Sequence, residues 1–245
     1  MQTVAKTAIV TGASRGIGHA IARRLAADGF NLVVNYAGNT IKAEETVAAI
    51  TAGGGNAIAI RADVSRHDQV ATLFHEAADA FGDVDVVVHN AGIMPMAPIG
   101  DEGLEDFDRT IASNLRSTFL MMATARRYLT TGGRFIALSS SVLAKNFPGY
   151  GPYIASKAGV EGLVRVFANE LRGRNITVNA IAPGPVATEL FMRGKSEGEI
   201  AQIVKLAPLE RIGEPHDIAS AVAFLAGPDG AWVNGQVLRV NGGFA

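Results

Sequence analysis

The stretch that decides the fold is Thr7-Ala8-Ile9-Val10, followed at once by Thr11-Gly12-Ala13-Ser14-Arg15-Gly16-Ile17-Gly18. The short apolar run predicts a buried strand, and the apolar spacing from Ile17 to Ala27 predicts a helix directly after the turn. Such a turn offers backbone N–H groups and a helix N-terminus to a pyrophosphate, and glycines let the ligand approach closely. The sequence therefore predicts a dinucleotide-binding turn, with Gly-x-x-x-Gly-x-Gly in place of the commoner Gly-x-Gly-x-x-Gly.

The same alternation of strand and helix continues along the chain. Apolar runs predict strands at 7–10, 31–35, 57–60, 84–88, 134–138, 176–181 and 236–240, and helical spacing predicts helices at 17–27, 40–52, 65–81, 104–129, 152–171 and 214–225. Ser65 is the expected N-cap of its helix. Strands that are apolar throughout are buried on both faces, so the pattern predicts an α/β fold with a parallel sheet. Without a linker or repeat, residues 1–245 are expected to form one domain.

The region Pro183 to Pro208 is the longest insertion between a strand and the next helix. It follows a strand end, where ligands bind in open α/β sheets. We expect residues 183–208 to form a substrate lid, with a helix near Ser196 to Leu206.

Composition excludes several classes of function. Of 245 residues 48% are apolar, the formal net charge is −1, and there is no cysteine. A balanced charge argues against nucleic acid as a partner, and the lack of cysteine excludes disulfides and thiolate metal sites. The scattered histidines predict no metal site, no apolar run is long enough to span a membrane, and the N-terminus resembles no signal peptide. A cytoplasmic protein is expected.

The end of the second strand bears on the choice of cofactor. NAD-binding sheets usually place an acidic residue there, whereas this chain has Asn35-Tyr36-Ala37-Gly38-Asn39. The missing carboxylate permits a 2′-phosphate, and Arg15 in the glycine turn can supply a matching cation. The two features predict NADP(H) rather than NAD(H). Asp63-Val64 after the third strand is placed to contact adenine, and Asn90-Ala91-Gly92 after the fourth lets the chain pass close to the cofactor.

Tyr153 and Lys157 lie four residues apart in a predicted helix, and therefore on one face of it. An ammonium beside a phenol favours the phenolate, so the pair predicts a lowered pKa for Tyr153. Such a tyrosine can exchange a proton with a carbonyl or alcohol oxygen. Tyr150, with Ile154 four residues on, lacks the lysine partner.

Together these motifs resemble the short-chain dehydrogenase/reductase family over the whole chain. The motifs occur in the family's order: residues 11–18, Asn90-Ala91-Gly92, Asn114, Ser140, Tyr153 with Lys157, and Pro183-Gly184. The resemblance implies a single-domain Rossmann-type fold with a doubly wound, parallel, seven-stranded sheet. It also implies hydride transfer between nicotinamide and a carbonyl carbon.

The resemblance also implies roles for individual residues. Tyr153 would be the general acid/base, Lys157 would lower its pKa and bind the nicotinamide ribose, Ser140 would bind the substrate oxygen, and Asn114 would hold a water for proton relay. Of three adjacent serines, the spacing to Tyr153 favours Ser140 over Ser139 and Ser141. Thr188 matches a contact to the nicotinamide carboxamide. His89 stands where many relatives have asparagine; we expect it to make a strand-end hydrogen bond, with a helper role in catalysis as the alternative. The expected cofactor contacts are Gly12, Ser14, Arg15, Gly16, Ile17, Gly18, Asn35, Tyr36, Asp63, Val64, Asn90, Ala91, Gly92, Tyr153, Lys157, Pro183, Gly184, Val186 and Thr188.

Two substrate classes fit the resemblance: small carbonyl compounds, as in NADPH-dependent aldehyde/ketone reductases, and acyl thioesters, as in 3-oxoacyl-[acyl-carrier-protein] reductases. An acyl carrier protein would require a basic patch, for which Arg126, Arg127, Arg172 and Arg174 are available, but residues 128–133 are neutral. We therefore favour a carbonyl reductase. An apolar substrate pocket, or alternatively a packing surface, is expected from Met94, Met96, Phe147, Tyr150, Phe191 and Met192.

Two other functions remain open: a non-catalytic dinucleotide sensor, and a different enzyme on the same fold, such as an epimerase or dehydratase. The complete set Asn114, Ser140, Tyr153 and Lys157 argues against a sensor. The family resemblance implies a homotetramer.

Overall fold

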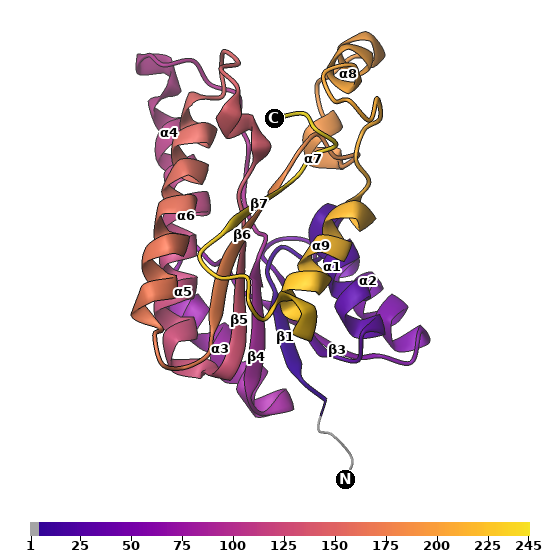
Figure 1. Ribbon diagram of the computed structural model, residues 1–245, viewed down its shortest axis with the longest axis vertical. Helices are drawn as coiled ribbons and strands as arrows, with labels where there is room; N and C mark the ends of the chain where they lie inside the picture. The colour runs from indigo at the N-terminus through magenta and orange to yellow at the C-terminus, as the bar shows by residue number, and fades with distance from the viewer. Residues whose placement is uncertain (1–4) are drawn as a thin grey trace.

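The computed structural model of the protein describes residues 5–245. Residues 1–4, part of the segment expected to contain no signal peptide, lie outside the described part. Seven strands form one parallel sheet, as predicted (Figure 1). The strand order is β3-β2-β1-β4-β5-β6-β7. The strands are β1 Thr7–Val10, β2 Asn31–Tyr36, β3 Asn56–Arg61, β4 Val84–His89, β5 Leu129–Leu138, β6 Thr177–Pro183 and β7 Val237–Val240.

Helices cover both faces of the sheet. Figure 1 shows α1, α2 and α9 on one side and α3, α4, α5 and α6 on the other. These helices are α1 Gly16–Ala27, α2 Thr40–Ala52, α3 His67–Phe81, α4 Leu104–Thr110, α5 Ser117–Tyr128, α6 Gly151–Glu170 and α9 Pro215–Ala226. Each strand contributes to both cores by alternation: Ile9 packs towards α3, α5 and α6, while Ala8 and Val10 pack towards α1, α2 and α9. The doubly wound arrangement follows from this burial on both faces.

The order of the strands reverses between β1 and β4, so the segments that follow these two strands diverge to opposite faces. The carboxyl ends of β1 and β4 lie side by side, with Val10 paired to Val88. Ligands of open α/β sheets bind at such a reversal point. The glycine turn after β1 and Asn90-Ala91-Gly92 after β4 meet there.

Three local predictions were wrong. The helix expected from 104 to 129 is interrupted, because a π-helical segment, η2 Ile111–Arg116, separates α4 from α5. The cap of α3 is Arg66 and not Ser65, whose hydroxyl and backbone N–H both donate to Asp63 Oδ1. Strand β5 begins at Leu129, which pairs with Val84 of β4. The pairing register then shifts before Arg134 pairs with Val86, and Gly132 in this irregular stretch has a φ of 84°.

The 183–208 segment contains two helices, α7 Glu189–Met192 and α8 Glu197–Val204. The helix expected near Ser196 to Leu206 is therefore present. Figure 1 shows α7 and α8 above the carboxyl ends of the strands. Within residues 5–245, no helix has the length and apolar character needed to cross a membrane.

Candidate active site

The glycine turn is held in place by Asn90. The side-chain amide of Asn90 donates to the carbonyl oxygens of Thr11 (3.0 Å) and Gly12 (3.1 Å). Gly12 and Gly16 have φ angles of 62° and 56°, the left-handed region that residues with a Cβ rarely adopt. The turn after β1 and the loop after β4 therefore form one hydrogen-bonded unit.

Gly18 serves packing and does not line the cleft described below, although it was predicted to contact the cofactor. A Cβ on Gly18 would lie 2.3 Å from the carbonyl oxygen of Gly12 and 2.5 Å from Asn90 Nδ2. Both distances are far inside van der Waals contact. Glycine at this position allows α1 to begin against the turn, and the contact of Gly18 with the cofactor stays a prediction.

His89, at the end of β4, connects the turn to the start of α5. Thr11 Oγ1 accepts from the backbone N–H groups of Asn90 and Ala91, so its own proton donates to His89 Nδ1 (3.0 Å). His89 Nε2 then carries the ring proton and donates to Ser117 Oγ (3.0 Å). Burial, aided by the charge of Lys157, lowers the pKa of His89 to about 3, consistent with this neutral ring. The expected strand-end hydrogen bond is present.

A cleft of about 510 Å³ runs over the carboxyl ends of β1 to β4. Its lining includes these predicted cofactor residues: Gly12, Ser14, Arg15, Gly16, Ile17, Asn35, Tyr36, Asp63, Val64, Asn90, Ala91, Gly92 and Thr188. The Asn35 amide donates to the carbonyl oxygens of Ile60 (3.3 Å) and Ala62 (3.0 Å), so it mainly ties β2 to the end of β3. The dimensions and the glycine-rich wall suit an extended nucleotide.

A second, smaller cavity of about 150 Å³ adjoins the cleft. Its walls contain Ser140, Tyr153 and Lys157, together with Pro183, Gly184 and Val186 from the start of the 183–208 segment. Asn90, Gly92, Ile17 and Thr188 line both spaces. The predicted catalytic hydroxyls thus face the space next to the nucleotide cleft.

Tyr153 and Lys157 lie on the same face of α6, with Lys157 Nζ 5.8 Å from the centre of the Tyr153 ring. The predicted fall in the tyrosine pKa is nevertheless wrong for this structure. Burial raises the pKa of Tyr153 to about 12, and the neighbouring Ser140 hydroxyl only partly opposes that rise. The phenol is desolvated, and desolvation penalises the phenolate.

Lys157 is buried, and its ammonium donates to the carbonyl oxygen of Leu138 (2.6 Å) at the end of β5. Burial lowers the pKa of Lys157 to about 8. An ammonium has three protons, so two remain for other acceptors in the cavity. The lysine is therefore anchored by β5 while it faces the cavity beside Tyr153.

The three adjacent serines have different surroundings. Ser139 Oγ donates to Glu161 Oε1 (2.6 Å), and Ser141 Oγ donates to the carbonyl oxygen of Ala182 (2.8 Å), both from buried residues. Ser140 is only partly buried, and its hydroxyl accepts a longer bond from Val142 N (3.3 Å). Its hydroxyl proton is thus available to a ligand, which distinguishes Ser140 from its neighbours.

Asn114 lies in the π-helical segment, behind Gly92, where a Cβ on the glycine would come 3.0 Å from Asn114 Oδ1. Its amide donates to the carbonyl oxygen of Ile93 and to Ser156 Oγ, and Oδ1 accepts from Ile93 N (2.8 Å). Both amide protons are therefore used. A π-turn commonly occurs at functional sites, and here it joins the loop after β4 to α6; the water-holding role of Asn114 stays a prediction.

The apolar part of the small cavity contains Met94, Phe147, Tyr150 and Phe191, as expected. Met96 and Met192 are exposed and do not contribute to its walls. Thr188 caps α7 through its hydroxyl, which accepts from Phe191 N (3.2 Å). The sequence reasoning missed Phe244, which reaches this cavity from the far end of the chain.

Glu189 and Lys42 were also missed. Glu189 lines the larger cleft from α7, and its carboxylate pairs with Arg15 and Lys42. The sequence did contain a signal for Lys42: it lies in the first turn of the helix after β2, and that helix begins at the edge of the cleft.

Known proteins of similar sequence match this chain over nearly its whole length. Residues 12–245 match a protein-family model described as enoyl-(acyl carrier protein) reductase. A short-chain type dehydrogenase/reductase of Picea abies is 45% identical, over 97% of this chain and 92% of that protein. An NADPH-dependent aldehyde reductase-like protein of Arabidopsis thaliana is 44% identical, over 98% of this chain and 94% of that protein. A 3-oxoacyl-[acyl-carrier-protein] reductase of Staphylococcus epidermidis is 42% identical, over 97% and 98%.

Solved structures are similar over the same length. A short-chain dehydrogenase of Burkholderia cenocepacia in complex with NADP superimposes with a TM-score of 0.92 at 37% identity, covering 98% of this chain and 97% of that one. A blue fluorescent protein from a metagenomic library in complex with NADPH gives 0.92 at 40% identity, covering 98% of both chains.

Proposed function

Because the chain belongs to the short-chain dehydrogenase/reductase family, we propose that it is an NADPH-dependent carbonyl reductase. In the proposed reaction, a hydride adds to the carbonyl carbon of an aldehyde or ketone, and the Tyr153 phenol donates a proton to the carbonyl oxygen. The observation that carries the proposal is the placement of Tyr153, Lys157 and Ser140 around one small cavity that opens on a nucleotide-sized cleft.

NADPH fits the residues that line the cleft. The bound nicotinamide would supply the hydride. Gly12 and Gly16 provide a close backbone approach for the pyrophosphate, Asn35 and Tyr36 end β2 without an acidic side chain, and Arg15 offers a cation for the 2′-phosphate. The relatives named for NADPH and the NADP-containing structures support the same cofactor.

The protein groups act on the substrate oxygen. A Tyr153 pKa of about 12 keeps the phenol protonated at neutral pH, as a proton donor must be. Negative charge develops on the carbonyl oxygen as hydride arrives, and hydrogen bonds from Ser140 and Tyr153 stabilise it. The same negative charge draws the proton from the Tyr153 phenol. The Lys157 ammonium, which is mostly protonated below its pKa of about 8, then stabilises the phenolate that remains.

The dimensions and apolar walls of the substrate cavity favour a small compound. About 150 Å³ corresponds to a space that holds benzene. A 3-oxoacyl thioester carried by an acyl carrier protein is the second candidate, because the Staphylococcus epidermidis relative bears that name. Two of the arginines considered for a carrier-binding patch are engaged: Arg126 pairs with Glu170, and Arg174 donates to the carbonyl oxygens of Arg126 and Leu129.

The proposal is tested with the variants Tyr153→Phe and Tyr150→Phe. Both residues line the small cavity, but only Tyr153 has a lysine on its helix face. We expect Tyr153→Phe to lower kcat by at least about 100-fold, the usual contribution of a general acid, with NADPH binding retained. Tyr150→Phe is the matched control and should keep most of the turnover.

The assay follows NADPH consumption with a panel of aldehydes, ketones and acetoacetyl thioesters. Turnover by Tyr153→Phe equal to that of the unmodified protein would remove the assigned role of Tyr153. Activity with NADH and none with NADPH would contradict the cofactor assignment, and turnover of thioesters alone would favour the second candidate.

A further inference from the structure

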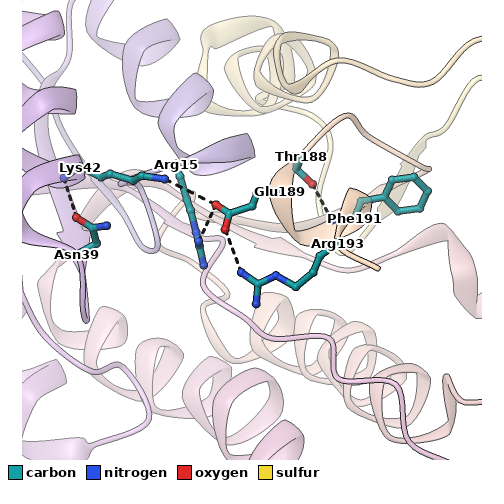
Figure 2. A network of polar contacts seen from close by, with 7 residues as sticks. All are labelled: Arg15, Asn39, Lys42, Thr188, Glu189, Phe191 and Arg193. Atoms are coloured by element: carbon teal, nitrogen blue, oxygen red, sulfur yellow. Dashed lines mark hydrogen bonds and ion pairs between the residues drawn. The ribbon is translucent and has the colours of Figure 1, made fainter. Parts of the chain in front are cut away.

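The carboxylate of Glu189 is surrounded by three cations from three parts of the chain (Figure 2). Its Oε2 lies 2.9 Å from Arg15 Nη1 and 3.7 Å from Lys42 Nζ, and its Oε1 lies 3.0 Å from Arg193 Nη2. Arg15 belongs to the glycine turn and Lys42 to α2. Glu189 is the first residue of α7, and Arg193 is the C-cap that follows this helix. A single carboxylate oxygen is therefore shared by two cations from the two nucleotide-side elements.

The position of this cluster is specific to one end of the cleft. Arg15, Asn39 and Glu189 all line the larger cleft, next to the ends of β2 and β3 and away from Tyr153. The Asn39 side chain accepts from Lys42 N (3.0 Å) and so fixes the first turn of α2 at the cleft edge. An NADP molecule with its nicotinamide beside Tyr153 would place its adenosine at this end.

The cations Arg15 and Lys42 would bind a phosphate more strongly than they bind the Glu189 carboxylate. A phosphate monoester carries close to two negative charges and three acceptor oxygens, whereas the Glu189 carboxylate has one charge and two oxygens. Arginine and lysine bind phosphate strongly through charge-assisted hydrogen bonds. The side chains of Arg15, Lys42 and Glu189 are 55%, 42% and 50% exposed, so the existing bridges are solvated, weak and easily exchanged.

We propose that Lys42 joins Arg15 in binding the 2′-phosphate of the cofactor, and that Glu189 competes with this phosphate for the same two cations. The inference rests on the proposed use of NADP(H). Phosphate binding would free Glu189 from the glycine turn and from α2, and would thereby detach the start of the 183–208 segment from the nucleotide side. By linkage, the same competition weakens NADP(H) binding whenever Glu189 holds the cations.

Equilibrium binding of NADP⁺ and NAD⁺ tests the competition directly. In Glu189→Gln we expect NADP⁺ to bind about 2- to 5-fold more tightly, the range for one exposed charge pair, with NAD⁺ affinity unchanged. In Lys42→Met we expect NADP⁺ to bind roughly 10-fold more weakly, as for a lost charge-assisted phosphate contact, again without change for NAD⁺. Glu197→Gln and Lys205→Met, exposed positions on and just after α8, are the matched controls.

Limited trypsin digestion gives a second readout that does not depend on turnover. Arg193 and Lys195 follow Glu189 in the 183–208 segment and are trypsin sites. We expect adenosine 2′,5′-bisphosphate to speed cleavage there and adenosine 5′-monophosphate to leave it unchanged. In Glu189→Gln, cleavage should be fast from the start and insensitive to the bisphosphate.

The outcomes separate this inference from the proposed function. Unmodified protein that binds NADP⁺ no more tightly than NAD⁺ contradicts the cofactor assignment itself. If the unmodified protein prefers NADP⁺ but Glu189→Gln and Lys42→Met behave like their controls, only the proposed competition between Glu189 and the 2′-phosphate is overturned. The proposed competition is also overturned if Glu189→Gln binds both NADP⁺ and NAD⁺ more tightly. The same holds if adenosine 2′,5′-bisphosphate slows trypsin cleavage or leaves it unchanged.

Discussion

At the scale of single residues, Gly18 leaves no room for a larger side chain. We predict that Gly18→Ala destabilises the protein by about 1–3 kcal/mol, the usual range for overpacking, because its Cβ would overlap the Gly12 carbonyl and the Asn90 amide. Cofactor binding should weaken as the turn shifts. Urea unfolding and NADP⁺ binding measure the two effects.

The control for that substitution is Gly198→Ala. Gly198 lies in α8, and a Cβ there would meet nothing within 4 Å. Its stability should stay within about 0.5 kcal/mol of the unmodified protein. Equal stability losses in the two variants would show that the contact around Gly18 is not the cause.

The spacing of Tyr153 and Lys157 predicted their common helix face, but not the direction of the tyrosine pKa. Spacing places the ammonium, whereas the pKa also depends on how much water the fold removes. Burial raises the pKa of Tyr153 and lowers that of Lys157, and both groups are thereby pushed towards their neutral forms. Which of three adjacent serines is free to act also depends on tertiary partners, namely Glu161 and Ala182.

At the scale of elements, α8 depends on its N-terminal cap. Ser196 and Glu199 form a reciprocal capping box, and α8 has no buried residue to hold it in place. We predict that Ser196→Ala speeds hydrogen exchange in α8 by roughly 5-fold, equivalent to about 1 kcal/mol for a lost cap. Global stability should not change, because the helix lies outside the cores.

Ser65→Ala is the informative comparison for Ser196→Ala. Ser65 was expected to cap α3, but the N-cap is Arg66, whose side chain makes no capping hydrogen bond. Hydrogen exchange in α3 should therefore be unaffected by this substitution. Fraying of α3 in Ser65→Ala would mean that Ser65 stabilises its N-terminus after all.

Strands were predictable and the interruption of the long helix was not. Short runs of apolar, β-branched residues such as Val86 to Val88 predict a strand buried on both faces. The π-turn at residues 111–116 leaves the apolar spacing almost unchanged, and its cause is tertiary: the Asn114 side chain bonds both backbone groups of Ile93. No local pattern in the sequence contains that contact.

At the scale of the whole molecule, His89 links stability to pH. Its folded pKa of about 3 lies below the ordinary value of 6.5, so the unfolded chain binds a proton that the folded one excludes. The contribution of His89 to the free energy of unfolding is fully present above pH 6.5. It falls as the pH drops towards 3, by about 1.4 kcal/mol per pH unit within that window.

We therefore predict that His89→Asn lowers the acid sensitivity of unfolding. Urea midpoints between pH 7 and 4 would fall less steeply for the variant, even if its stability at pH 7 is lower. Parallel slopes for the two proteins would mean that His89 is not the group responsible. The difference in the free energy of unfolding between the two proteins at pH 7 measures separately the loss of the hydrogen bonds that join Thr11, His89 and Ser117.

The last residues of the chain return to the small cavity beside Tyr153. Phe244 forms part of its wall, and the Asn241 amide donates to the carbonyl oxygen of Ala245 and to Ser141 Oγ. Figure 1 places this end of the chain beside α7, at the opposite pole from the start of β1. A purification tag fused after Ala245 would consequently emerge next to the small cavity, whereas a tag fused ahead of β1 would leave that cavity open.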